Sequence, residues 1–245
     1  MYKYIILILC LMFALFSGCS KSENIKELAT IHPEDQLSKV NTSNIFKEDN
    51  FYLTSSITIN DIVAYESGET KTPRKTDIVN IKVYKVSDYQ NGSIYKLVIP
   101  PIDDHDGYLN KGRLNIYFYV TADKIYRLWS YIYNDEKLIE FYDDDNLLLK
   151  CLDTEEKIMK NSYLIFQPKP MPDVKKEDEI GMHNFLDIKD NQIISRMWIT
   201  KNNGDTDFYE EFTWDLNKGL VVYDSGYGAE SEILYIKDIA LLDTH

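Results

Sequence analysis

Apolar and polar positions alternate along most of the chain after residue 50. The segment 114–120 reads LNIYFYV, and the segments 79–84 (VNIKVY) and 207–214 (DFYEEFTW) show the same period of two. Successive side chains of a strand point to opposite faces, so this period predicts strands with one buried and one wetter face. We therefore expect β-strands over most of 51–245.

Turn-forming residues separate the alternating segments at short intervals. Asn91-Gly92 and Asn203-Gly204 are dipeptides that tolerate the positive φ angles of tight hairpin turns. Short strands joined by such turns predict a mainly β fold. We expect an antiparallel meander that forms either a sandwich or a curled, barrel-like sheet, with one or two short helices.

A proline-rich stretch interrupts the pattern late in the chain. Residues 167–173 read QPKPMPD, and proline has no N–H to donate to a sheet ladder. We expect a single antiparallel β domain over 51–245 with this stretch as its seam, because the roughly 70 residues that follow would form only a marginal core. Short helices are expected near 33–46 and at 153–156, where Asp153 and Glu156 have capping-box spacing.

The first eighteen residues differ from the rest of the chain. Lys3 precedes an unbroken apolar run from Ile5 to Phe16, which as a helix is about 18 Å long. The hydrocarbon core of a membrane is roughly 30 Å thick, so this run is too short to span it. These features predict a signal peptide over 1–18 that is removed on export. An uncleaved anchor or a plain secretory signal is the alternative.

A cysteine follows directly after the predicted signal peptide. The residues Phe16-Ser17-Gly18-Cys19 resemble the lipobox of bacterial lipoproteins, although Leu is more usual at the position of Phe16. The resemblance implies that Cys19 carries fatty acyl chains such as palmitate, which attach the protein to a membrane. We expect 19–50 to contain the lipidated cysteine, a polar tether and the first short helix. The expected location is the outer face of the cytoplasmic membrane or the outer membrane.

The segment 214–229 (WDLNKGLVVYDSGYGA) also resembles the ending of uncharacterised bacterial lipoproteins. A Trp strand, a Gly-Leu turn and a Tyr-x-Ser-Gly-x-Gly-Ala segment carry the resemblance, which implies no particular activity. Gly226 and Gly228 predict a bend or bulge before the last strand.

The net charge of the chain is -13 at neutral pH. An acidic surface argues against binding nucleic acid, and against binding anionic lipid through a basic patch. Attachment to a membrane would then depend on the acyl chains at Cys19.

Aromatic residues are abundant, with 19 tyrosines in the chain. Six aromatic residues fall on two adjacent predicted strands, 114–120 and 125–133: Tyr117, Tyr119, Tyr126, Trp129, Tyr131 and Tyr133. They could form a rigid aromatic surface that binds a protein or a carbohydrate. The alternative, which we favour because tyrosine-rich strands are ordinary in antiparallel sheets, is that these are strand residues whose rings pack and whose hydroxyls reach water. The sequence leaves both interpretations open.

Catalytic and metal-binding patterns are weak in this sequence. The spacing of Ser93 and Lys96 matches Ser-x-x-Lys, but on a strand these side chains point to opposite faces. The four histidines have no zinc-ligand spacing, and the acidic runs 103–106 and 143–146 are expected to form solvated turns. We predict no catalytic residues, no metal site and no cofactor.

These features favour a lipid-anchored, non-enzymatic envelope protein that binds a partner protein or an extracellular ligand. An immunity-type lipoprotein that neutralises a basic toxin belongs to this class. One alternative is an envelope hydrolase of sugar or peptide polymers, which would need paired carboxylates beside a cleft. Another alternative is a carrier of hydrophobic molecules, which would need an apolar cavity in a barrel.

Overall fold

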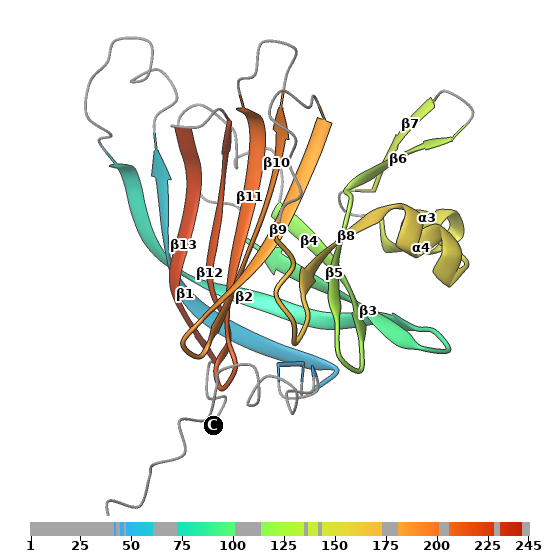
Figure 1. Ribbon diagram of the computed structural model, residues 1–245, viewed down its shortest axis with the longest axis horizontal. Helices are drawn as coiled ribbons and strands as arrows, with labels where there is room; N and C mark the ends of the chain where they lie inside the picture. The colour runs from blue at the N-terminus through green and yellow to red at the C-terminus, as the bar shows by residue number, and fades with distance from the viewer. Residues whose placement is uncertain are drawn as a thin grey trace, which may run out of the picture. The chain divides into compact units, whose positions relative to one another are not determined.

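Thirteen strands and two helices make up the described part of the chain (Figure 1). The computed structural model describes residues 42, 45–46, 48–60, 73–100, 114–134, 137–141, 144–172, 181–200, 206–227 and 231–241, all within the unit Pro33–His245. The strands are β1 (Asn50–Asn60), β2 (Pro73–Asp88), β3 (Gly92–Ile99), β4 (Leu114–Thr121), β5 (Ile125–Leu128), β6 (Tyr131–Asn134), β7 (Lys137–Glu140), β8 (Ser162–Phe166), β9 (Gly181–Lys189), β10 (Gln192–Thr200), β11 (Thr206–Asp215), β12 (Gly219–Tyr227) and β13 (Ser231–Leu241). The helices are α3 (Asp145–Cys151) and α4 (Glu155–Lys160).

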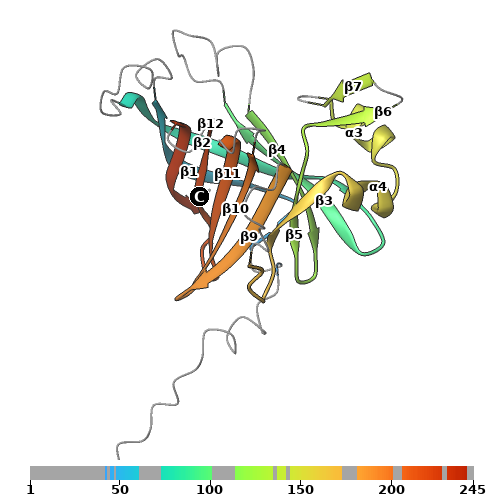
Figure 2. The ribbon, with the colours of Figure 1, turned by 45° about the horizontal axis from the view of Figure 1, so that its top comes forward.

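Eleven of these strands form one strongly curved antiparallel sheet. Across the sheet the strands follow in the order β8-β5-β4-β3-β2-β1-β13-β12-β11-β10-β9. Most neighbouring strands in this sheet are also consecutive in the chain. The two neighbouring pairs that are not consecutive are β1–β13 and β5–β8. The prediction of a mainly β antiparallel meander is confirmed. Of the two expected forms, the curled, barrel-like sheet is present (Figures 1 and 2).

The two edge strands, β8 and β9, meet and almost close the barrel. The side-chain amide of Asn184 in β9 donates to the carbonyl of Leu164 in β8 at 2.8 Å. Beyond the end of β8, Met171 exchanges two backbone hydrogen bonds with Leu186 of β9, of 3.0 and 2.7 Å. This line of contact, the barrel seam, covers edges that would otherwise expose unpaired backbone groups. The strands before and after the proline-rich stretch 167–173 belong to the same sheet.

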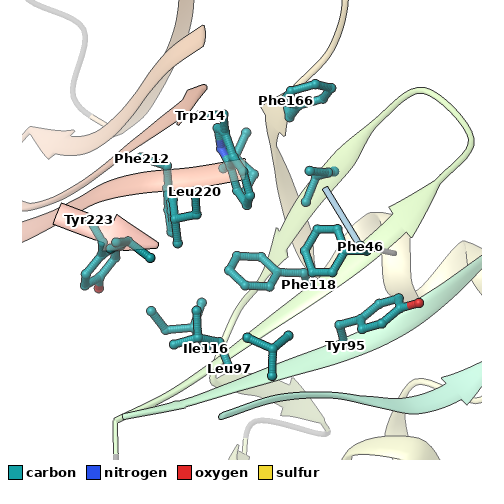
Figure 3. Close-up of a cluster of buried hydrophobic side chains, with 14 of the residues drawn as sticks. Phe46, Tyr95, Leu97, Ile116, Phe118, Phe166, Phe212, Trp214, Leu220 and Tyr223 are labelled. Carbon is teal, nitrogen blue, oxygen red and sulfur yellow. The ribbon is translucent and has the colours of Figure 1, made fainter. Parts of the chain in front are cut away.

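The alternation along each strand divides side chains between the interior and the outer face of the barrel. Phe118 of β4 is buried in the interior cluster, whereas its neighbours Tyr117 and Tyr119 belong to a separate outer cluster. Aromatic and aliphatic side chains fill the interior (Figure 3). There Phe212 and Trp214 of β11 stack with ring centroids 6.3 Å apart, and Phe118 lies 6.0 and 5.9 Å from them.

A buried ion pair lies inside the barrel. Arg127 of β5 contacts the carboxylate of Glu210 of β11, with Nη2 and Oε1 3.3 Å apart. Tyr223 donates to Glu210 Oε1 at 2.8 Å, and Tyr163 donates to Oε2. Burial and the nearby carboxylate raise the pKa of both tyrosines well above the usual range, so both hydroxyls remain protonated donors. The cluster joins β5 and β8, on one side of the barrel seam, to β11 and β12 on the other.

Residues 129–161 leave the sheet between β5 and β8 and form a layer outside the barrel (Figure 2). This outer insertion contains the hairpin β6–β7 and the helices α3 and α4. Its base is closed by the N–H of Trp129, which donates to the carbonyl of Asn161 at 3.0 Å. Apolar side chains of both helices, including Leu148 and Ile158, pack in one cluster with Tyr117 of β4.

Helix α4 is the helix expected at 153–156, with a different cap. Thr154, and not Asp153, is the N-cap residue, and its hydroxyl accepts from a backbone N–H three residues later at 3.3 Å. The first helical residue, Glu155, accepts hydrogen bonds from the backbone N–H and the side-chain amide of Asn91, at 2.7 and 2.6 Å. These bonds hold the helix against the tip of the β2–β3 hairpin.

Helix α3 corrects the expectation that 143–146 is a solvated turn. Asp144 caps this helix by accepting from the N–H of Leu147 at 2.9 Å, and Asp145 and Asn146 are already helical. The run of leucines that follows supplies the buried face. The other helix that was expected, at 33–46, lies almost entirely outside the described residues.

Asp145 fastens α3 to the outer face of the barrel. Its Oδ1 accepts from Lys96 Nζ at 2.8 Å and from the Tyr117 hydroxyl at 2.7 Å, and its Oδ2 accepts from the Tyr84 hydroxyl at 2.8 Å. Burial opposes ionisation of this carboxyl. The three hydrogen bonds, led by that of Lys96, together outweigh burial and hold the pKa of Asp145 below its usual range.

Removing the charge of Glu210 should destabilise the barrel strongly. Glu210→Gln leaves the Arg127 guanidinium buried without a counterion, which costs about 3–5 kcal/mol of the free energy of unfolding. Urea denaturation at neutral pH measures this loss.

The neighbouring residue gives a matched control. Glu211 lies on the outer face, partly exposed, 3.8 Å from Arg196. Glu211→Gln should therefore cost less than about 1 kcal/mol. Equal losses for the two variants would contradict a structural role for the buried pair.

Protonation of Asp145 should loosen the outer insertion. Because the pKa of Asp145 is lowered on folding, its contribution to stability is complete above the pKa of an unfolded aspartate, about 3.9. The contribution is lost as the pH falls through the lower, folded pKa. The stability difference between the wild type and Asp145→Asn should therefore be largest at neutral pH and shrink toward about pH 2, as measured by urea denaturation across the pH range.

Asp153→Asn is the control for this pH dependence. Asp153 is exposed and pairs with Lys157 at 2.8 Å on the surface of the same insertion. Its loss should change stability by about 0.5 kcal/mol or less. If the advantage of the wild type over Asp145→Asn were the same at low and neutral pH, the role of the Asp145 carboxylate would be refuted.

Candidate functional site

An apolar cavity of about 220 Å³ opens at the end of the barrel where β11 turns into β12. We call it the mouth cavity. Its walls come from both halves of the sheet and from the segment before β1. The lining residues are Ile45, Phe46, Glu48, Phe51, Leu53, Val83, Leu97, Phe118, Trp214, Asn217, Lys218, Gly219, Leu220 and Ala240. Most of these are apolar, and the polar ones are Glu48, Asn217 and Lys218.

Phe46 stands in the middle of this end of the barrel although it belongs to no strand. Its ring lies 4.7 Å from that of Tyr95, 5.9 Å from Phe118 and 6.2 Å from Trp214, measured between centroids. Figure 3 shows the Phe46 ring between Phe118 and Tyr95. Only 8% of Phe46 is exposed. A residue from outside the sheet thus completes the interior packing.

A second, more open cavity of about 180 Å³ also has Phe46 in its lining. Its walls include Tyr95, Val120 and Thr121. Phe46 is the one residue that the linings of the two cavities share. Phe46 therefore contributes to the wall of each cavity.

The segment that carries Phe46 is attached to the barrel at Thr42. The N–H of Thr42 donates to the carbonyl of Ala122 at 3.2 Å, and its hydroxyl donates to the carbonyl of Thr121. The N–H groups of Ile45 and Phe46 both donate to the carbonyl of Thr42 at 2.9 Å. One turn of chain, bonded to the end of β4, thus positions the ring.

The β11–β12 turn forms the rim of the mouth cavity. Asp215 Oδ1 accepts from the N–H groups of Asn217 and Lys218, at 2.8 and 3.0 Å, and so fixes the turn. Gly219 follows with φ of 89°, in the region where a side chain is unfavourable. This turn contributes Lys218 to the lining of the cavity, and the segment before β1 contributes Glu48, a charge of opposite sign.

Trp214 brings a polar group to this apolar wall. It is 1% exposed, and its indole N–H finds no acceptor among the described residues. A buried donor without a partner costs roughly 1–3 kcal/mol.

The six aromatic residues predicted as a binding surface do not share one open face. Tyr117 and Tyr119 are buried beneath the outer insertion, and their hydroxyls bond Asp145 and Glu155 at 2.7 and 3.0 Å. Burial and the Glu155 carboxylate raise the pKa of Tyr119. These two residues are therefore not an accessible platform, because the insertion covers the outer face of β4.

The other four members of that set lie in different surroundings. Tyr126 is half-buried beside Tyr119, at 6.2 Å between ring centroids. Trp129 packs at 5.0 Å on Tyr163, toward the interior cluster. Tyr131 of β6 is 37% exposed. The side chain of Tyr133 lies outside the described part.

The remaining sequence predictions concern the lipidated cysteine, an acidic run, a serine–lysine pair, metal ligands and membrane helices. Cys19 and the acidic run 103–106 lie outside the described residues. Ser93 and Lys96 have separate partners, Asp88 at 2.6 Å and Asp145 at 2.8 Å. Within the described ranges no group of His, Cys, Asp and Glu side chains is arranged to hold a metal ion. In the same ranges no helix is long and apolar enough to cross a membrane.

The alternation pattern of β11 indicates that Glu210 lies in the interior, although the sequence analysis did not predict it. Glu210 has the same alternation phase as Phe208, Phe212 and Trp214, which places a carboxylate on a buried face and calls for a buried partner. Phe46 had no comparable signal, since it precedes the alternating region.

Comparison with protein-family models, with curated proteins and with solved structures finds no match to this chain. The resemblance to bacterial lipoproteins therefore stays a prediction from the sequence.

Proposed function

We propose that the protein is a lipid-anchored, non-enzymatic binding protein of the cell envelope, whose barrel holds a small apolar ligand in the mouth cavity. The mouth cavity is the observation that carries this proposal. Its lining is mainly apolar, and a few polar groups lie at its rim. Binding sites for small apolar molecules have this composition.

The volume of the mouth cavity suits a small ligand. At about 220 Å³ it exceeds the roughly 150 Å³ of an apolar cavity that admits benzene. It is smaller than the roughly 300–1,000 Å³ of pockets for drug-sized molecules. A ligand of one or two rings, or a short hydrocarbon chain, fits this range.

The composition of the cavities favours binding over hydrolysis. A glycosidase needs two carboxyl groups roughly 5–10 Å apart across its cleft. The linings of the two cavities contain one carboxylate between them, that of Glu48. The apolar walls favour the carrier alternative over the hydrolase.

The predicted anchor supports a role at the envelope. Cys19 precedes Phe46 by 27 residues, a length of chain that spans at most about 90 Å when extended. The segment attached to the acyl chains would thus lead directly into the turn that carries Phe46. The net charge of -13 disfavours attachment through anionic lipid, so the acyl chains would hold the protein in place.

Filling the mouth cavity should abolish binding of a small apolar probe. We expect 1-aminonaphthalene, which has two rings, to fluoresce more strongly with the wild type, because it enters an apolar site. Val83→Phe places a ring in the cavity and should weaken binding at least about tenfold. Fluorescence titration measures both affinities.

Met197→Phe is the control, since Met197 is buried inside the barrel but does not line the cavity. This variant should bind the probe as the wild type does. Absence of binding to the wild type, or equal binding to all three proteins, would refute a ligand site in the mouth cavity.

Lipidation at Cys19 is tested in cells. A labelled fatty acid should be incorporated into the wild type, and the protein should partition with membranes. Cys19→Ala removes the thiol that forms the thioether, so label should be lost and the protein released. Label retained by Cys19→Ala would overturn the anchor, and Cys151→Ala serves as the control that should keep its label.

A further inference from the structure

We propose that the ligand of the mouth cavity is a free α-amino acid with a large apolar side chain, such as phenylalanine. Its side chain fills the cavity, and its ammonium and carboxylate groups pair with Glu48 and Lys218. This inference rests on the proposed function and specifies the chemical class of the ligand. It draws on the unpaired charges of the cavity, on its apolar volume and on an interruption of the sheet beside it.

Two charges of opposite sign line the mouth cavity. Glu48 comes from the segment before β1 and Lys218 from the β11–β12 turn, and both residues are exposed. Within the described part of the chain neither side chain forms an ion pair, so the two are not joined to each other. A ligand with a single charge meets one attractive and one repulsive group here. A zwitterion pairs with both.

The remainder of the lining suits the apolar part of such a ligand. Four rings, those of Phe46, Phe51, Phe118 and Trp214, belong to it. The volume of about 220 Å³ exceeds the roughly 150 Å³ that admits benzene, so a benzyl group fits. An α-amino acid carries both charged groups and its side chain on one carbon atom. It therefore combines a charged end of both signs with a compact apolar body.

The sheet is interrupted beside the cavity. The ladder between β12 and β13 ends at the pair Tyr223–Ile236, although both strands continue beyond it. In this stretch β13 has a bulge, where Asp238 has φ of 55°, and a bulge bends its strand. Leu220 and Ala240 lie beyond the end of this ladder, and both line the cavity. Backbone groups there have no ladder partner between the two strands, and they supply hydrogen-bond partners for the polar end of an amino acid.

Four ligands with the same phenyl group test the need for both charges. Phenylalanine carries both, phenethylamine only the positive charge, 3-phenylpropanoate only the negative charge and 3-phenylpropanol neither. Each is titrated against the full-length protein with bound 1-aminonaphthalene, and the loss of probe fluorescence gives its affinity. At neutral pH phenylalanine should bind at least about threefold tighter than either singly charged ligand, because an exposed ion pair strengthens binding up to about fivefold. Equal affinities for phenylalanine and 3-phenylpropanol would overturn the proposal.

Removing each charge separately tests the two contacts. Glu48→Gln should weaken phenylalanine and phenethylamine about two- to fivefold and should not weaken 3-phenylpropanoate. Lys218→Gln should weaken phenylalanine and 3-phenylpropanoate by a similar factor and should not weaken phenethylamine. Both residues are exposed, so both variants should fold. Losses that do not follow the charge of the ligand would contradict the pairing.

Glu156→Gln and Lys160→Gln are the matched controls. Both residues are exposed on α4 and do not line the cavity, and the two changes alter the net charge in the same way. Neither should change the affinity for phenylalanine. If they weakened it as much as the cavity variants did, net charge and not contact would explain the effect, and the proposal would fail.

Further ligands test the apolar side chain and the free amino acid. Alanine has the same two charges with only a methyl group, and it should bind at least about tenfold more weakly than phenylalanine. Phenylalanylglycine and glycylphenylalanine separate the two charges by a peptide unit and should also bind more weakly. Tighter binding of either dipeptide would reject the free amino acid in favour of a peptide end.

The probe separates this inference from the proposed function. If the wild type binds 1-aminonaphthalene but shows no preference for phenylalanine, the amino acid is rejected as the ligand and the apolar site remains. If the wild type does not bind the probe, the proposed function fails, and the amino-acid site fails with it.

Discussion

The interior of an eleven-stranded curved sheet is wider than its own strands can easily fill. Eight strands give a barrel that side chains just fill, and each further strand widens it. This protein fills the extra width with large aromatic side chains, a buried ion pair with two tyrosines, and a phenylalanine from outside the sheet. The mouth cavity is the part of that width which remains unfilled. The core, the buried charges and the candidate site therefore share one geometric origin.

The buried polar cluster and Phe46 fill two different parts of the wide barrel interior. Arg127 and Glu210 connect strands on opposite sides of the barrel seam, and Tyr163 and Tyr223 both donate to the Glu210 carboxylate. A buried ion pair of this kind adds little to the free energy of unfolding compared with apolar packing. Removing one partner, however, is strongly destabilising, so the pair fixes which strands face each other. Phe46 closes the end of the barrel with an apolar ring that no strand ladder holds in place.

The alternation of the sequence was sufficient to predict the fold class, because a period of two reports directly which face of a strand is buried. It did not distinguish helix from strand in the leucine-rich stretch 147–152, since short apolar runs are ambiguous. There the structure depends on Asp144 as a cap and on the contacts of Asp145 with distant strands. The outer insertion also explains why the tyrosines of β4 could not be assigned to an open surface. The burial of these tyrosines depends on the outer insertion, whose strands β6 and β7 form no ladder with the main sheet.

The mouth cavity was beyond sequence reasoning for a different reason. Its walls come from seven strands and the turn before β1, and several of them meet only because β1 pairs with β13. Alternation specifies the buried face of each strand but not its neighbours. Trp214 and Phe46 lie far apart in the sequence, and nothing in either segment indicates their contact.

The barrel seam differs from the rest of the sheet in how its two strands are held together. Neighbouring strands elsewhere in the sheet are joined by ladders, whereas β8 and β9 are joined by one side-chain hydrogen bond and one bridge beyond the end of β8. This line therefore has fewer backbone hydrogen bonds than the ladders, and side-chain contacts make up more of the connection across it. The buried Arg127–Glu210 pair and its tyrosines also bond across this line, so side chains and not backbone ladders hold the two edges of the sheet together.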